Sequence, residues 1–367
     1  MLIHVLTAYP SPPIDPSNFC HLWLRESAAL DSFQKHQLTD DPDAADMILF
    51  AESHFNWDPY MLKVLLHPVY RRHRQKCFVY HDSDFALPIM RGIYPSIRRR
   101  DYQPDRCRAG AYIARINRNA AIRYEPGTTG GKWLYTFFGE RNSPVRAGLF
   151  RREHPKGLVR DTTGRSLWGV EPGPQLETFT GAYAQAILDS RFVLCPAGIG
   201  PSSYRLYETM EMGRVPVILS DDWVPPPGPR WSDFSLHLPE SSLPELESLL
   251  IGFISQQPRM AQLAREEWQR WFDKPVCFHH LVEACLEVKN TPASPSRFCA
   301  PVAAWPNAPI SGFSRSRLDG RAKGGFCPLR TPARRMPDPW LTREEAPASA
   351  GGCSAAGWRS RWSPARG

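Results

Sequence analysis

The sequence of 367 residues contains no apolar run that approaches the roughly 18–20 residues of a membrane-spanning helix. Its first residues, MLIHVLTAYPSPP, have neither the basic start nor the small-residue cleavage site of a secretory signal peptide. This stretch is instead typical of a first β-strand. We therefore expect a cytoplasmic protein.

Cysteine pairs with metal-binding or redox spacing are also missing. The chain has nine cysteines, an odd number for a disulfide framework, and those before residue 290 include no C-x-x-C pair. The stretch CFHHLVEAC, residues 277–285, has metal-binding residue types, but its spacing is unlike that of structural zinc sites and its pattern is helical. We expect buried thiols and solvated histidines there.

Most of the chain has no excess of charge of either sign. The whole sequence holds 45 Lys+Arg and 37 Asp+Glu, a net charge of +8. Residues 291–367 contain 12 of the basic and 4 of the acidic residues, so the first 290 residues carry 33 of each. A neutral body has no broad basic field for nucleic acid, and we expect no nucleic-acid partner.

The stretch from residue 291 to residue 367 lacks apolar periodicity and is rich in Pro, Ala, Ser, Gly and Arg. Such a segment cannot bury enough apolar surface to offset the entropy cost of ordering it. We expect a disordered basic tail. A basic arm that touches RNA or anionic lipid is one alternative, and an unnatural extension is another.

The first 290 residues alternate short apolar runs with helical patterns. Runs rich in β-branched and aromatic residues predict strands at residues 2–9, 47–52, 77–82 and 133–139. Helical patterns cover residues 18–36 and 58–74, and a second series of helices and strands covers residues 178–273. The alternation predicts mostly parallel sheets with helices on both faces. We expect two βα domains, residues 1–150 and 151–290, with the final helices packing back across the cleft between them.

The stretch LCPAGIGPSSYRLYE, residues 194–208, joins a predicted strand to a predicted helix through a turn. Free backbone N–H groups and the helix dipole at such a junction form a site for an anion. Gly198 and Gly200 permit close backbone approach or positive φ, and Pro201 suits the first helical position. The pattern therefore indicates an anion site at this turn.

Four side chains around this turn could extend the anion site into a binding site for a nucleoside diphosphate. Ser202 and Ser203 add hydroxyl donors, and Arg205 can reach the same anion with two N–H groups. Glu208 lies on the same helical face and can accept hydrogen bonds from a ribose diol. The structural alternative is an ordinary strand–helix turn with Arg205 and Glu208 as a surface ion pair. The turn matches neither G-x-G-x-x-G nor G-x-x-x-x-G-K-[ST], so it favours neither NAD nor a P-loop nucleotide.

The longer block SRFVLCPAGIGPSSYRLYETMEMGRVPVILSDDWVPP strongly resembles the signature of exostosin-like glycosyltransferases, glycosyltransferase family 47. The similarity extends downstream to GPRWSDFSLHLPE. Upstream, TDDPDAADMILF, CFVYHDSDFALPIMRGIYPSI and YTFFGERNSPVRAGLF match the family's general form more loosely. The resemblance covers most of residues 1–290 and none of the tail.

This resemblance implies an α/β fold of the GT-B type, in which two Rossmann-like domains face a cleft. The C-terminal domain would bind a nucleotide sugar such as a UDP-sugar, and the N-terminal domain would bind a glycan or polysaccharide acceptor. The implied enzyme is a glycosyltransferase of EC 2.4 type in polysaccharide biosynthesis. Glu208 falls where related GT-B enzymes place a ribose-binding glutamate. Many retaining enzymes carry a second glutamate eight residues earlier, where this chain has Gly200, so we expect an inverting reaction without metal or cofactor.

The departing diphosphate needs positive partners. Arg205 and the start of its helix are the first candidates, and we expect Arg146 and Arg141 to complete the clamp from across the cleft. Asp221 and Asp222 follow a predicted strand at its carboxyl end. There they would bond donor-sugar hydroxyls or order the turn.

An inverting transfer also needs a base that accepts the proton of the acceptor hydroxyl. We assign this role to Asp84, on which the match to DSDFALP centres, with Asp82, Glu52 and His54 as alternatives. Asp82, Ser83 and Asp84 also spell D-x-D, a manganese-binding pattern of GT-A enzymes. We expect a turn rather than a metal site there.

Two hypotheses of other classes compete with an active transferase. A catalytically inactive homologue could bind nucleotide sugar or glycan as a sensor, and a nucleic-acid-binding protein could use the basic tail. The neutral body opposes the second of these. Peripheral membrane association through the acceptor and a partner transferase stay open, since neither leaves a mark in the sequence.

Overall fold

The structure is a computed structural model that describes residues 1–9, 19–53, 58, 60–113, 118–127, 131–164 and 173–292. The chain divides into two units, Met1–Cys299 and Ala300–Gly367. The second unit lies wholly outside the described residues. The prediction of a disordered tail over residues 291–367 therefore falls almost entirely on residues that the structure does not describe.

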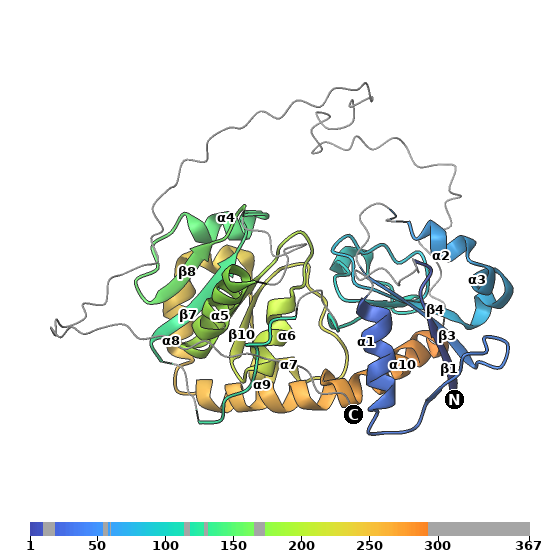
Figure 1. Ribbon diagram of the computed structural model, residues 1–367. Coiled ribbons are helices and arrows are strands. Elements are labelled where there is room, and N and C mark those ends of the chain that lie inside the picture. Colours follow the sequence, from blue (N-terminus) through green and yellow to red (C-terminus); the bar gives the residue numbers. More distant parts are fainter. Residues whose placement is uncertain are drawn as a thin grey trace, which may run out of the picture. The chain divides into compact units, whose positions relative to one another are not determined.

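The first unit contains two separate parallel sheets with helices (Figure 1). The first sheet has the strand order β2-β1-β3-β4-β5-β6. Its strands are β1 (Leu2–Leu6), β2 (Gln37–Leu38), β3 (Met47–Glu52), β4 (Cys77–His81), β5 (Gly92–Tyr94) and β6 (Cys107–Ala109). Its helical elements are α1 (Phe19–Ala29), α2 (Leu62–Leu66), α3 (Pro68–His73) and the 3₁₀ turns Arg74–Lys76 and Arg99–Asp101. Every residue of β3 and β4 is buried, as expected for strands covered on both faces.

The second sheet has the strand order β11-β10-β9-β7-β8. Its strands are β7 (Trp133–Gly139), β8 (Gly157–Asp161), β9 (Ser190–Pro196), β10 (Val215–Leu219) and β11 (Leu236–Leu238). The accompanying helices are α4 (Pro144–Phe150), α5 (Pro174–Leu188), α6 (Tyr204–Glu211), α7 (Trp231–Phe234), the 3₁₀ turn Glu240–Glu245, α8 (Leu246–Gly252) and α9 (Gln257–Trp271). In each sheet the chain reverses its direction of strand addition once, between β1 and β3 and between β7 and β9. Ligands of open parallel sheets bind beyond the carboxyl ends of strands at such reversals.

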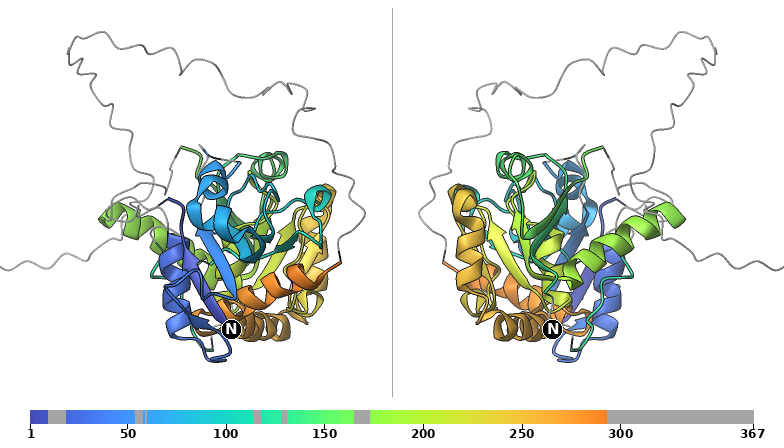
Figure 2. Two further views of the ribbon diagram at one scale, coloured as in Figure 1. Left: turned by 90° about the vertical axis from the view of Figure 1, so that its right-hand side faces the viewer. Right: turned by 90° about the vertical axis from the view of Figure 1, so that its left-hand side faces the viewer.

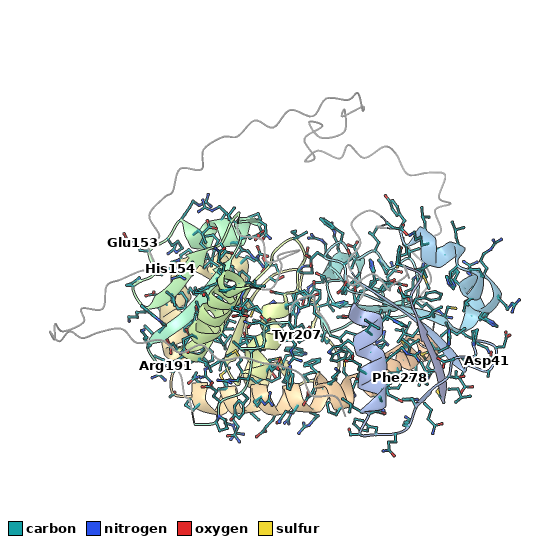
Figure 3. The ribbon with its side chains drawn as sticks, viewed as in Figure 1. Asp41, Glu153, His154, Arg191, Tyr207 and Phe278 are labelled. Atoms are coloured by element: carbon teal, nitrogen blue, oxygen red, sulfur yellow. The ribbon has the colours of Figure 1, made fainter. Side chains whose placement is uncertain are left out.

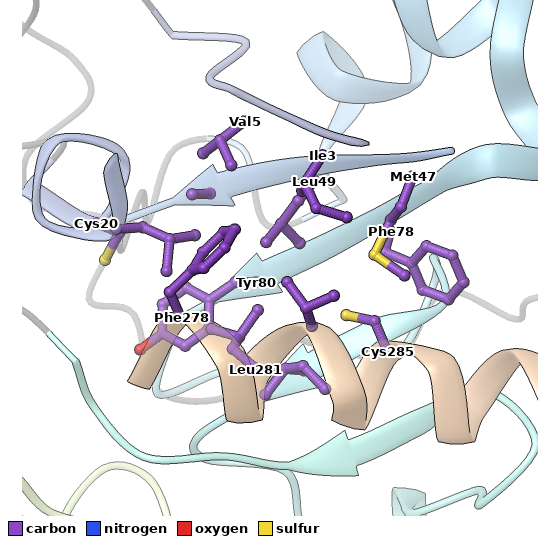
Figure 4. Packing of buried hydrophobic residues seen from close by; sticks show 14 of the residues in the cluster. Ile3, Val5, Cys20, Met47, Leu49, Phe78, Tyr80, Phe278, Leu281 and Cys285 are labelled. Carbon is purple, nitrogen blue, oxygen red and sulfur yellow. The ribbon is translucent and has the colours of Figure 1, made fainter. Parts of the chain in front are cut away.

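The last described helix, α10 (Lys274–Asn290), returns to the first sheet, while α9 before it packs on the second. Figure 2 shows α10 in orange and α9 in gold from two opposite sides. Phe278, Leu281 and Cys285 of α10 join a core formed mainly by the first sheet and α1. Figure 4 shows these side chains pointing toward Leu49 and Tyr80. The prediction that the final helices pack back is confirmed.

The predicted boundary between the two βα series is wrong. We expected the strand at residues 133–139 in a first domain that ends at residue 150. The structure pairs β7 in parallel with both β8 and β9, which makes it a central strand of the second sheet. The transition between the sheets therefore lies between β6 and β7, because sheet membership is decided by pairing and not by order along the chain.

Two predicted helices are also shorter than expected. The pattern over residues 18–36 forms only α1, and the pattern over residues 58–74 splits into α2 and α3 at Pro68, which begins the second helix. We expected this helix to begin at residue 58, but α2 begins at Leu62. The carboxylate of Asp58 accepts the backbone N–H groups of Leu62 and Lys63 at 2.9 and 3.0 Å. Among the described residues, no helix combines the length and the apolar character needed to cross a membrane.

Candidate functional site

Two arginine side chains occupy the carboxyl ends of β7 and β9, where the second sheet reverses its strand order. Arg205 of α6 donates to the carbonyl of Phe138 near the end of β7. Arg146 of α4 donates from Nη2 to the carbonyl of Pro196 at the end of β9, at 3.2 Å. The two guanidinium carbons lie 4.6 and 5.5 Å from the ring centroid of Phe137. The fold thus gathers two positive charges around one aromatic ring.

These two arginines keep unused hydrogen-bond donors. Nε of Arg146 and both Nε and Nη1 of Arg205 are buried and have no hydrogen-bond partner in the described structure. Neither side chain takes part in an ion pair among the described residues. Burial and the charge of Arg205 lower the pKa of Arg146 to about 9. A bound anion would supply the missing acceptors and offset the repulsion between the two cations.

The turn after β9 packs tightly at both glycines. A Cβ added to Gly198 would lie 2.7 Å from Nη2 of Arg146. A Cβ added to Gly200 would clash with the hydroxyl of Ser96 and lie 3.0 Å from the carbonyl oxygen of Asp84. Both glycines therefore lie where a side chain would meet the protein's own atoms, and backbone approach to an anion stays a prediction. Neither residue is among the described glycines with positive φ.

The helix after this turn begins later than predicted. Pro201 lies in the turn, and α6 starts at Tyr204. Ser203 is the N-cap, and its hydroxyl accepts the backbone N–H of Arg205 at 3.3 Å. Ser202 is buried, and its backbone N–H points at the hydroxyl of Ser96, 3.5 Å away. The hydroxyl oxygen of Ser203 therefore caps the helix.

Glu208 lies one turn beyond Arg205 on α6. Its carboxylate accepts a hydrogen bond from the hydroxyl of Tyr183 at 2.7 Å. Glu208 also lines a cavity of about 240 Å³ together with Tyr112, Tyr204 and other side chains from both halves. Tyr207, labelled in Figure 3, lines the same cavity and donates to the carbonyl of Gly110 at 3.1 Å. The carboxylate is thus oriented by a phenol and borders open space.

Two carboxylates of the first half face α6 across a pair of stacked tyrosines. The rings of Tyr112 and Tyr204 stack at 4.2 Å. The hydroxyl of Tyr112 donates to Asp84 at 2.6 Å, and that of Tyr204 donates to Asp82 at 3.3 Å. Asp82 is 5 % exposed, and burial with the nearby charge of Asp84 raises its pKa to about 7. Asp84 is half-buried and therefore the more accessible carboxylate.

The other two candidate bases lie elsewhere or are not described. Glu52 is fully buried and accepts hydrogen bonds from the hydroxyl of Thr7 and the backbone N–H of Ala8, both at 2.8 Å. These contacts give it a structural role at the strand reversal of the first sheet. His54 lies outside the described residues.

The structure changes our account of both arginines after β7. Arg146 does not reach the site from across the cleft, because α4 follows β7 and belongs to the second half with Arg205. Arg141 is exposed and forms an ion pair with Asp161 at 2.9 Å. The structure does not bring Arg141 to the buried pair.

Asp221 and Asp222 hold protein segments together at the carboxyl end of β10. The carboxylate of Asp221 accepts the backbone N–H of Glu240 at 3.1 Å. Asp222 pairs with Arg98 at 3.3 Å. These contacts fit the turn-ordering alternative, although Asp221 is exposed.

Sequence reasoning missed the segment 96–99 of the first half, which contacts both turns of the second. Arg98 donates to the carbonyl of Ile199 at 3.1 Å. Arg99 donates from its backbone to Asp222 and from Nη2 to Trp223, both at 2.9 Å. The run RRR, residues 98–100, directly after the matched segment was the available signal, since it places several donors after β5.

Comparisons with known proteins identify relatives over part of this chain. Residues 111–252 match the Exostosin GT47 domain. Probable glucuronosyltransferase GUT1 of Oryza sativa subsp. japonica is 38% identical over 199 residues, which cover 47% of this chain and 43% of the relative. Probable glucuronoxylan glucuronosyltransferase IRX7 of Arabidopsis thaliana is 41% identical over 108 residues, 26% of this chain and 24% of the relative.

The chain spans less than half the length of the curated relatives it matches, 43% of the rice protein. Among solved structures, Anabaena Alr3699/HepE in complex with UDP aligns with a TM-score of 0.34 and 12% identity over 78% of this chain and 97% of the other. The resemblance to exostosin-like glycosyltransferases is confirmed over residues 111–252, and the two parallel sheets confirm the predicted α/β fold.

Proposed function

We propose that this chain, which carries an exostosin GT47 domain, transfers a sugar from a UDP-sugar to a glycan or polysaccharide acceptor. The observation that carries the proposal is the arginine pair at the β7–β9 reversal. Arg146 and Arg205 present three buried guanidinium nitrogens without hydrogen-bond partners in the described structure. A diphosphate is the group of a nucleotide sugar that this arrangement suits best, because it brings charge and acceptors together.

The remaining donor contacts follow from the position of the arginine pair. With the diphosphate at the carboxyl ends of β7 and β9, Glu208 is placed one helical turn away to accept hydrogen bonds from the ribose. Tyr183 holds the Glu208 carboxylate at 2.7 Å and so limits its rotamers. The backbone of the turn at Gly198 and Gly200 lies close to the position proposed for the diphosphate.

The reaction that we propose inverts the anomeric centre and uses no metal. The acceptor hydroxyl attacks the anomeric carbon while the bond from that carbon to the diphosphate oxygen breaks. Arg146 and Arg205 stabilise the negative charge that develops on the diphosphate. Asp84 accepts the hydroxyl proton, and its half-buried position between Tyr112 and the Gly200 turn supports this assignment.

Titration of the full chain with UDP in the absence of divalent metal tests the donor site. Each of Arg146→Gln and Arg205→Gln should weaken UDP binding by about 1.5–3 kcal/mol, roughly 10- to 150-fold, since each removes a charged hydrogen-bond donor. Arg151→Gln is the matched control, because Arg151 lies exposed at the end of α4. Equal affinity in all variants would refute the diphosphate site.

A transfer assay separates the enzyme from an inactive sensor. We expect the chain to release UDP from a UDP-sugar only when a glycan acceptor is present. Tight UDP-sugar binding without acceptor-dependent UDP release across a panel of xylan and glucan oligosaccharides would favour the sensor.

A cytoplasmic location is part of the same proposal. The six cysteines among the described residues are all free and buried, which supports a reducing compartment. Fractionation of cells that produce the chain tests this location. Recovery from a membrane-enclosed secretory compartment would contradict it.

We also propose peripheral contact with a membrane that carries the acceptor. Leu62 and Leu66 lie one turn apart on α2 and are 54% and 67% exposed, with Lys63 between them. An exposed apolar pair beside basic side chains suits an anionic lipid surface. Sedimentation with anionic vesicles should recover the chain, and the double change Leu62→Ser and Leu66→Ser should reduce recovery. Equal recovery of both proteins would contradict the contact.

A further inference from the structure

Three side chains with metal-ligating atoms meet far from the proposed donor site. His36 lies directly before β2, and His279 and Glu283 lie one turn apart on α10. One ligand atom from each of the three lies within 4.8 Å of the others. The two segments are more than two hundred residues apart in the sequence, so only the packing of α10 on the first sheet brings them together.

Polar atoms in this cluster have too few partners. The side chain of His36 is 0% exposed, and its Nε2 lies 2.8 Å from Oε1 of Glu283. The Nδ1 atom of His36 and the Nδ1 atom of His279 are both buried without a hydrogen-bond partner in the described structure. Buried polar atoms without partners are rare because each costs free energy. The ring of His279 stacks on that of Phe33 at 3.8 Å, but neither this contact nor the His36–Glu283 pair gives its Nδ1 atom a hydrogen-bond partner.

The positively charged side chain of Lys35 already contacts this cluster. Nζ of Lys35 lies 2.8 Å from Oε1 of Glu283, the same oxygen that His36 contacts. Lys35 has a 59% exposed side chain, so it can swing into solvent without leaving a cavity behind. The Glu283 side chain is 32% exposed, which opens a path from solvent to the cluster.

We propose that His36, His279 and Glu283 bind a divalent transition-metal ion, with Zn²⁺ as the metal that fits this ligand set. Two imidazole nitrogens and one carboxylate oxygen are ligands that zinc commonly takes, with a water in the fourth position. Tetrahedral coordination needs ligand atoms roughly 3.3 Å apart, so small side-chain rotations must close the cluster. The neighbouring His280 is not a ligand, because its Nε2 contacts the carbonyl of Arg270 at 2.9 Å.

The position of this site makes it a structural link and not part of the transfer reaction. Gln37 follows His36 and pairs with Leu2 at the start of β1, so the cluster lies at the amino end of the first sheet. Asp84 and the arginine pair lie beyond carboxyl strand ends. A metal would join the segment before β2 to α10 and would stabilise the folded state in proportion to its occupancy.

Titration of the full reduced chain with Zn²⁺ against a chromophoric chelator tests the proposal. We expect one tight site per chain, and a more than tenfold loss of affinity in His279→Ala and in Glu283→Gln. His280→Ala is the matched control and should bind like the wild type. Equal affinity of the ligand variants and the wild type would overturn the proposal.

Two further measurements separate this site from adventitious binding. Lys35→Met should raise Zn²⁺ affinity several-fold, because it removes the competing cation, and unchanged or weaker binding would contradict the assignment. Cobalt in place of zinc should give an absorption spectrum without thiolate-to-metal charge-transfer bands. Such bands would show that cysteines hold the ion and would overturn the proposal.

Discussion

At the scale of the residue, the arginine pair is the feature on which the proposed chemistry depends. Burial makes each charge costly, and the second guanidinium adds repulsion to that cost. Buried charged groups are often found at functional sites, where a ligand of opposite charge offsets the free-energy cost of their burial. Arg146 is 8% exposed, and its burial together with the charge of Arg205 lowers its pKa to about 9.

The pH dependence of UDP binding should report this group. Because the pKa of Arg146 is lowered to about 9, its charge is lost as the pH rises through that value. We expect constant UDP affinity between about pH 7 and 8 and weaker binding above about pH 9. Calorimetric titration of the wild type and Arg146→Gln checks this result. A decline of the same size in the variant would assign the titration to another group.

The same lowered pKa makes stability depend on pH, with the same sign as for a carboxylate whose pKa is lowered in the folded state. Above about pH 9 the unfolded chain keeps a proton on Arg146 that the folded chain releases, so this group makes the free energy of unfolding rise with pH in that range. Bound UDP favours the charged form and should reduce this contribution.

Asp84 and Asp82 differ in a way that kinetics can separate. Asp84→Asn should lower kcat by roughly 10²–10⁴-fold without changing UDP affinity, since the base acts on the acceptor. Asp82 has a pKa raised to about 7 by burial, so Asp82→Asn should change stability near neutral pH more than it changes kcat. The reverse pattern of kcat losses would make Asp82 the base.

At the scale of the element, the turn from β9 to α6 can pack against its neighbours because glycine has no side chain. Gly200 has no room for a Cβ because Ser96 and the carbonyl of Asp84 fill that space. The turn therefore contacts the first half at Ser96 and Asp84. The N-cap at Ser203 then sets the direction of α6 and of Arg205 along it.

A substitution at this turn should destabilise the folded state, and a second substitution should restore part of the lost stability. Gly200→Ala places a methyl group against the hydroxyl of Ser96, and we expect a loss of about 1–3 kcal/mol, measured by urea unfolding. The second change Ser96→Gly removes the clashing hydroxyl and should restore part of the loss. An additive effect of the two changes would show that the clash is not the cause.

At the scale of the whole molecule, α10 is the last helix that packs on the core of the first sheet. Thr291, directly after this helix, accepts a hydrogen bond from Nη2 of Arg108 at 2.9 Å. The described part of the chain thus includes a contact within the segment that we assigned to the tail.

Removal of residues 293–367 should leave the fold and the proposed UDP site intact. We expect the shortened chain to keep the wild-type melting temperature within a few degrees and to retain UDP affinity, since the arginine pair, Glu208 and α10 all precede the cut. Differential scanning calorimetry and UDP titration check both. A chain cut at residue 273 serves as the contrasting control, because it loses α10 and the core contacts of Phe278. Loss of UDP binding in the longer fragment would give the tail a role.

The sequence alone determined the local features of this protein. The strands β3, β4 and β7 are apolar runs whose character depends on neighbouring residues, so their bounds are predictable within a residue. The turn at Gly198 and Gly200, with Arg205 and Glu208 after it, is likewise a short-range pattern. The roles of these residues in donor binding stay predictions until UDP is titrated.

Only the tertiary structure decided which distant segments meet. It placed β7 in the second sheet, brought Arg146 to Arg205, and left Arg141 exposed beside Asp161. It also joined His36 to α10. Strand pairing and helix packing couple residues far apart in the chain, and the free energy of those contacts depends on burial that no single stretch of sequence reveals.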